Sequence, residues 1–177
     1  MDYQQKKSTL EQIICNKVFQ YGIIETSNLQ FSRQVVDMCK ANRCGRYGKY
    51  WTCPPAVDGQ KRLKEYRQCY GHILVMTTCH NLQDSFDYEG MINAGKQHNR
   101  LMRVLFKDLP FETVLLLAHG CKKCSVCTYP DEPCRFPDQA TPSLEACGID
   151  VAELARKCQI NYINGTDTVT YFSALLF

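Results

Sequence analysis

The sequence predicts a single α+β domain with a small mixed or antiparallel sheet and cysteine-rich loops. Two short apolar runs, His72–Thr78 and Thr113–Ala118, have the length and composition of buried strands. Amphipathic helical patterns alternate with these runs, and most of the twelve cysteines gather in two segments without periodicity. A chain of 177 residues that is 45% hydrophobic can build one core. We therefore treat residues 1–177 as one domain.

Residues 1–33 are predicted to form an N-terminal helical extension. Thr9–Phe19 has the pattern of an amphipathic helix, and Ser8 before it is a suitable N-cap. The apolar residues at helical spacing are Leu10, Ile13, Ile14, Cys15 and Val18. Because free cysteine is common in protein cores, we interpret Cys15 as a core residue.

Helices and strands alternate in the middle of the chain. A short helix over Gln34–Met38 leads into a loop that extends from Cys39 to Pro55. Asp58–Cys69 is charged with one apolar face, which is typical of a surface helix. The first apolar run follows, then a long helix over Ser85–Lys107, and then the second apolar run.

The C-terminal third begins with a cysteine- and proline-rich insertion over residues 121–142. Ser143–Lys157 is predicted to be a helix that its one glycine interrupts. Asn161–Ile163 and Thr168–Leu176 are predicted to form a hairpin around the Asn-Gly pair between them. The predicted order of strand, helix, strand, helix, strand, strand is compatible with a ferredoxin-like βαβαββ arrangement.

Composition restricts the classes of partner and the compartment. The net charge of +3 predicts neither nucleic acid nor membrane binding. No apolar run approaches the roughly 18 residues that span a bilayer. The polar start, Met1–Lys7, is unlike a secretory signal. A chain this long without a signal is expected to be cytoplasmic, with reduced thiols that bind metal rather than form disulfides.

The strongest motif is C-x2-C-x2-C-x6-C, formed by Cys121, Cys124, Cys127 and Cys134. Thiols spaced so closely can converge on one small object. Bacterial ferredoxins hold a cubane iron–sulfur cluster with a similar C-x2-C-x2-C-x3-C-P run. Zinc is the alternative, although zinc ribbons separate their two C-x2-C pairs by a dozen or more residues. The spacing favours a 4Fe-4S cluster over zinc.

Another motif, Cys39-x4-Cys44-x8-Cys53, offers three thiols and is followed by two prolines. A fourth ligand for a centre at this motif could be Cys69, Cys79, His80 or a thiol of the C-x2-C-x2-C-x6-C motif. Ferredoxins with two clusters exchange ligands in this way. Alternatively, a cluster with three protein thiolates leaves one iron open, or these cysteines hold structural zinc or are only buried thiols. One or two clusters are therefore expected.

Other residues near the motifs have supporting roles. Cations in or beside the loops could stabilise an anionic cluster or attract an anionic partner; they are Arg46, Lys49, Lys122, Lys123 and Arg135. Aromatic residues that could shield a cluster from water are Tyr47, Tyr50 and Trp51. Cys147 and Cys158, on the C-terminal helical segment, are interpreted as core residues.

Four segments together resemble a known family. They are residues 44–55 (CGRYGKYWTCPP), 121–137 (CKKCSVCTYPDEPCRFP), 142–151 (PSLEACGIDV) and 168–172 (TVTYF). They resemble a prokaryotic family of unknown function described as predicted metal-binding proteins, over most of the chain after about Val35. The resemblance implies a cysteine-ligated centre, iron–sulfur in type, in a cytoplasmic protein of anaerobic metabolism. The implied ligands are Cys39, Cys44, Cys53, Cys121, Cys124, Cys127 and Cys134.

The function predicted first is electron transfer, or redox service to a partner enzyme, by an iron–sulfur protein with a redox protein as partner. A zinc-stabilised interaction module is the alternative without chemistry. An enzyme that binds substrate at an open iron of the Cys39, Cys44 and Cys53 centre is the third hypothesis.

Overall fold

A four-stranded antiparallel sheet with the order β1-β2-β4-β3 forms the centre of the structure. The computed structural model describes residues 1–177. The strands are β1 (Gln20–Glu25), β2 (His72–Asn81), β3 (Val114–Leu116) and β4 (Thr168–Leu176). The two long strands, β2 and β4, occupy the middle of the sheet, and their pairing extends from Ile73 and Leu176 to Asn81 and Thr168.

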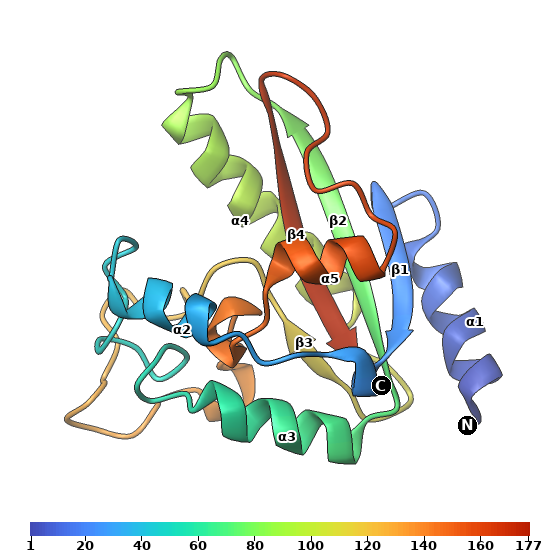
Figure 1. The fold of residues 1–177 in the computed structure, drawn as a ribbon, viewed down its shortest axis with the longest axis horizontal. Coiled ribbons are helices and arrows are strands. Elements are labelled where there is room, and N and C mark those ends of the chain that lie inside the picture. Colours follow the sequence, from blue (N-terminus) through green and yellow to red (C-terminus); the bar gives the residue numbers. More distant parts are fainter.

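Helices cover both faces of this sheet. They are α1 (Tyr3–Ile14), α2 (Arg33–Lys40), α3 (Gly59–Cys69), α4 (Tyr88–Leu105) and α5 (Val151–Lys157), with 3-10 turns η1 (Thr26–Asn28), η2 (Pro137–Gln139) and η3 (Glu145–Cys147). Figure 1 shows α5 in front of the sheet and α4 behind it. The arrangement has three layers, and the predicted α+β class is confirmed.

Each face of the sheet buries its own apolar cluster, because successive residues of a strand point to opposite faces. Ile73 and Val75 of β2 belong to the cluster that includes residues of α3 and α5. Leu74 and Met76 belong to the cluster that includes residues of α1 and α4. All four side chains are fully buried. An apolar run buried on both faces explains why β2 is central.

Short polar side chains start the helices. An oxygen of each N-cap residue accepts a hydrogen bond from a backbone N–H of the first turn. The N-cap residues of α1 to α5 are Asp2, Ser32, Asp58, Asp87 and Asp150. The two C-terminal helical pieces are separate because Gly148 adopts a left-handed conformation (φ 72°) after η3. The predicted interruption at this glycine is confirmed.

Most predicted elements are confirmed with small changes of bounds. The short helix before Cys39 is α2, the surface helix is α3, the long helix is α4, and the two apolar runs contain β2 and β3. None of the helices has both the length and the apolar composition needed to cross a membrane.

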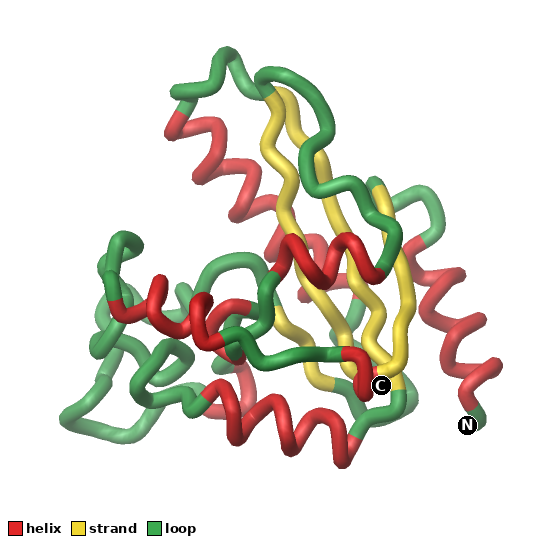
Figure 2. The backbone as a smooth tube through the Cα atoms, viewed as in Figure 1, coloured by secondary structure: helices red, strands yellow, loops and turns green.

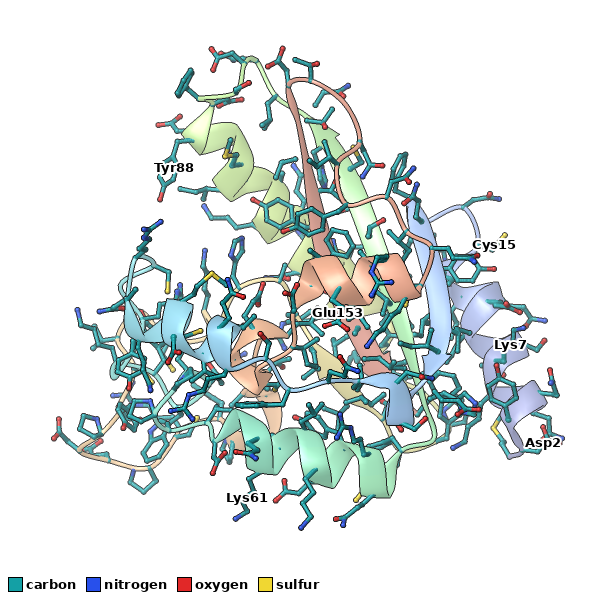
Figure 3. All side chains as sticks on the ribbon, in the orientation of Figure 1. Asp2, Lys7, Cys15, Lys61, Tyr88 and Glu153 are labelled. Carbon is teal, nitrogen blue, oxygen red and sulfur yellow. The ribbon has the colours of Figure 1, made fainter.

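The prediction that residues 1–33 form a helical extension is wrong in part. The N-cap of α1 is Asp2, which forms a capping box with Gln5, rather than the expected Ser8, and the helix ends at Ile14 rather than Phe19. Residues 20–25 then form the edge strand β1. Cys15 is exposed rather than in the core (Figure 3).

The predicted C-terminal hairpin is also wrong. Residues 161–163 form no strand, and β4 pairs instead with β2 on one side and β3 on the other. The chain after the Asn-Gly pair turns again through Asp167 (φ 52°) before β4 begins. All strand pairs are antiparallel, and a helix or helical turn separates β3 from β4 along the chain. The topology is therefore not the βαβαββ arrangement, in which the last two strands are consecutive.

The two cysteine-rich segments lie together at one end of the molecule. Figure 2 shows that the loop between α2 and α3 and the loop after β3 form a neighbouring pair with almost no regular structure. The fold thus brings together cysteines from distant parts of the chain.

Replacing Gly22 with alanine is expected to destabilise the protein by about 1–3 kcal/mol. A methyl group at this position of β1 would lie 2.6 Å from the carbonyl oxygen of Cys158, so the strand or the end of α5 must shift. The control is Gly71→Ala, whose methyl group meets no atom within 4 Å. Urea unfolding of the reduced proteins measures both changes. Equal midpoints for the two variants would contradict this packing.

Candidate metal centre

The first cysteine loop connects α2 to α3 and carries three thiols. Cys39 lies in the last turn of α2, and its thiol donates a long hydrogen bond (4.0 Å) to the carbonyl oxygen of Glu145. The backbone N–H of Gly48 donates to the carbonyl oxygen of Pro54 at 2.9 Å. This bond folds the segment between Cys44 and Cys53 back on itself, so the loop is compact without regular structure.

The second cysteine loop leaves and re-enters the sheet at one point. Leu117, directly after β3, forms a parallel bridge with Ser143, and its N–H donates to the carbonyl oxygen of Pro142 at 3.2 Å. The intervening residues contain only the turn η2. Closing a long loop costs conformational entropy, and the pairing of its two ends at the sheet offsets part of that cost.

The two loops are joined at Cys121. A guanidinium N–H of Arg46 donates to the carbonyl oxygen of Cys121 at 3.0 Å, and the N–H of Cys121 donates to the hydroxyl of Thr52 at 3.2 Å. A Cβ atom on Gly120 would lie 3.1 Å from the sulfur of Cys53. The two predicted motifs are therefore adjacent, with Cys53 against the backbone that precedes Cys121.

One small pocket is lined by all four cysteines of the C-x2-C-x2-C-x6-C motif. Its lining includes Cys121, Cys124, Cys127 and Cys134. All four are partly buried. The rings of Tyr50, Trp51 and Phe136 form part of the wall. The predicted shielding by Tyr50 and Trp51 is consistent with this wall, whereas Tyr47 does not line it.

Polar contacts hold this pocket in shape. The indole N–H of Trp51 donates to the carbonyl oxygen of Glu132 at 3.1 Å, and Arg135 donates to that of Val126 at 3.2 Å. The backbone N–H of Lys123 donates to the sulfur of Cys121 at 3.5 Å. An N–H directed at a cysteine sulfur stabilises its thiolate, the form that binds metal.

The thiols of the first loop influence one another electrostatically. Burial raises the pKa of Cys53 to about 11, Arg46 partly opposes this rise, and repulsion from Cys44 and Cys39 adds to it. The pKa of Cys39 is raised by burial, by Glu145 and by Cys44. The charges of the three thiols therefore act on one another within this loop. A metal that binds them must displace their protons, so its affinity will increase with pH.

The structure gathers the predicted ligand cysteines in the two loops without placing them around a single ion. No group of three or more His, Cys, Asp or Glu side chains lies close enough to hold one metal ion. Cys121, Cys124, Cys127 and Cys134 all line one pocket. In the other loop, Cys44 lies near enough to Cys39 and Cys53 to raise the pKa of both thiols.

Comparison with known families decides the classification. The model of the family "Predicted metal-binding protein (DUF2284)" matches residues 22–177. The chain belongs to this family. The match confirms the resemblance seen in the sequence and identifies the protein as a predicted metal-binding protein. Searches of curated proteins and of solved structures found no match.

The remaining cysteines lie away from the two loops or inside the core. Cys147 and Cys158 are buried, as predicted, and burial raises the pKa of Cys147 to about 12. Cys69 ends α3 and is exposed, whereas the first loop joins the opposite end of that helix. The side chains whose charges act on Cys53 include neither Cys69 nor Cys79. The structure thus gives no support to either as the missing ligand.

A histidine cluster that sequence reasoning missed lies between α4 and the sheet. The hydroxyl of Thr78 is 2.8 Å from Nε2 of His80 and 2.8 Å from Nδ1 of His98. Nε2 of His98 is 2.7 Å from the hydroxyl of Ser173, which also accepts the N–H of Ala118 at 3.2 Å. Thr78 and His80 are two residues apart in β2 and therefore lie on the same face of the strand. The sequence alone does not show that His98 and Ser173 meet them there. His80 is therefore bound into this network.

The free energy of unfolding is expected to fall as the pH drops below about 6.5, the ordinary pKa of histidine. Burial, aided by His80 and His119, lowers the pKa of His98 to about 3. Between these values the unfolded chain binds a proton that the folded chain does not. The contribution of the neutral His98 ring to the free energy of unfolding is fully present above pH 6.5. It falls by about 1.4 kcal/mol per pH unit as the pH drops toward 3.

Urea unfolding at about pH 7.5 and about pH 5.5 measures this loss. His98→Gln removes the titrating ring, so its stability should depend less on pH. His72→Gln, at the other end of β2, is the matched control and should keep the wild-type dependence. An unchanged pH dependence in His98→Gln would show that another group causes the loss.

Proposed function

We propose that the protein binds a 4Fe-4S cluster through Cys121, Cys124, Cys127 and Cys134 and exchanges electrons with a redox protein. The observation that carries this proposal is that the four thiols line one pocket with aromatic walls. When bound, such a cluster supplies single-electron transfer with little rearrangement.

The chain's own residues suit that role. The rings of Tyr50, Trp51 and Phe136 restrict water at the thiols. The N–H of Lys123 and the guanidinium of Arg46 place positive charge beside Cys121. Hydrogen bonds to sulfur and nearby cations make a centre easier to reduce. The pocket would thus tune a potential as well as hold a cluster.

A second centre at Cys39, Cys44 and Cys53 is part of the proposal. These thiols perturb one another, and Cys53 lies beside the backbone that precedes Cys121. No cysteine outside the two loops contributes to the raised pKa of Cys53. The second candidate function, an enzyme that binds substrate at an open iron, requires that no thiol of the neighbouring loop completes this centre.

All twelve cysteines are free thiols, which supports a cytoplasmic location.

Protein prepared without oxygen is expected to contain about four irons and four sulfides per chain in the centre at Cys121, Cys124, Cys127 and Cys134. Cys127→Ser should remove this content and the visible absorption, because it removes one ligand of the pocket. Cys15→Ser changes an exposed cysteine far from the pocket and should retain both. Zinc without sulfide in the wild type would end the electron-transfer proposal and favour the structural module.

If both centres are filled, the wild type should contain about eight irons. Cys53→Ser is expected to lower this to about four, since it removes a ligand of the second centre only. Cys69→Ser and Cys79→Ser should each keep all the iron. Loss of iron in either would show that the centre has a fourth protein thiolate, and the open-iron candidate would then fail.

A further inference from the structure

A large basic groove lies beside the cysteine pocket. It has a volume of about 1340 Å³ and runs from α4 to the second cysteine loop. Of its 27 lining residues, seven are Lys or Arg and one, Asp138, is acidic. This imbalance is local, because the whole chain carries a net charge of only +3. The groove therefore concentrates positive charge that the rest of the surface does not show.

One wall of the groove is a row of cations that we call the α4 stripe: Lys96, Arg100, Arg103 and Lys107. Steps of four, three and four residues put these side chains on one face of the helix and its continuation. From Lys96 to Arg103 the stripe extends about 10 Å along the helix axis. All four residues are exposed.

The stripe has no partner within the chain. None of the five ion pairs of the structure involves it. Like charges at this spacing weaken a helix, and the helix dipole compensates only in the last turn, where Arg103 lies. Lys122 of the second cysteine loop lines the same groove and adds another positive charge to it. An anion in the groove would relieve this repulsion.

The groove and the cysteine pocket share a wall. Trp51, Thr52, Lys123 and Cys134 line both. A molecule seated in the groove would therefore contact residues that also enclose the four thiols. That proximity suits electron exchange and has no purpose in a merely structural module.

We infer that the basic groove is the docking surface for an acidic segment of a partner protein, which reaches the cysteine pocket across the shared wall. This inference names the partner of the proposed redox centre and rests on the proposed function. The groove exceeds the roughly 300–1,000 Å³ of small-molecule pockets, so a protein segment fits it better than a small anion. Charge complementarity of this kind speeds encounter and aligns the partners.

Nucleic acid fits the groove less well. Single strands are held by a basic track together with aromatic rings on which bases stack. The ring of Trp51 is already fixed by its bond to Glu132 and by edge contact with Tyr129. The other two aromatic residues of the lining, Tyr66 and Phe106, are buried and offer no exposed ring for stacking.

The test is the binding of a fluorescent poly-L-glutamate peptide of about twelve residues to protein kept without oxygen. We expect saturable binding that weakens with salt. Arg100→Glu with Arg103→Glu should weaken it by about tenfold or more. The control is Lys61→Glu with Lys64→Glu on α3, two residues that do not line the groove, so it makes the same change of net charge elsewhere. Figure 3 labels Lys61 on this helix. The control should change affinity by less than about twofold.

Several results would overturn the inference. They are absence of binding at low salt, equal weakening by both double variants, tighter groove-dependent binding of an RNA oligomer of the same charge, or comparable binding of tripolyphosphate. Iron content separates this failure from failure of the proposed function. Iron without peptide binding rejects the groove, whereas groove-dependent binding without iron rejects only the redox role. Circular dichroism checks that each variant is folded.

Discussion

The contact of Arg46 and Thr52 with the backbone of Cys121 is the constraint on which the candidate site depends. Both cysteine loops lack helices and strands of useful length, so neither can position its thiols alone. The guanidinium and the hydroxyl satisfy the carbonyl and the N–H of the same residue. Buried backbone groups need such partners, and here they come from the other loop. The first loop thus acts as the support for the second.

This constraint explains why the site can be built at the end of a small sheet. The bridge between Leu117 and Ser143 returns the second loop to the sheet edge where it departed. The first loop is held between two capped helices, α2 and α3. What the fold does not supply is the free energy to deprotonate clustered thiols such as Cys53, whose pKa is about 11. Metal binding would supply it and would stabilise the loops at the same time.

The sequence predicted those parts of the fold in which local signals agree with tertiary packing. The apolar run of β2 is buried on both faces, and Asp58 caps α3 at the expected residue. It failed for β1, a short edge strand with only partly buried side chains and a glycine that the packing of α5 requires. The hairpin failed because the residues before the Asn-Gly turn signal, 161–163, form no strand, and both sides of β4 are occupied by β2 and β3.

The site was predicted unevenly for a related reason. Ligand spacing within the second loop is local, so the sequence sufficed to group Cys121, Cys124 and Cys127. The proximity of Cys53 to Gly120 depends on how two distant loops meet, and spacing contains no such information. The histidine cluster likewise requires β2, β4 and α4 to be in register before His80, His98 and Ser173 can meet.

The positive charges near the thiols fall into two groups with different tasks. Arg46 is tied to Cys121 and stacks over Tyr50 at 4.7 Å, so its charge is fixed beside the pocket. The α4 stripe is exposed, unpaired and separated from the thiols by the shared wall. A fixed inner charge can set the reduction potential of a centre, whereas exposed outer charges can change rates of encounter without altering that potential. The two properties are therefore separable by substitution, which a single shell of cations would not allow.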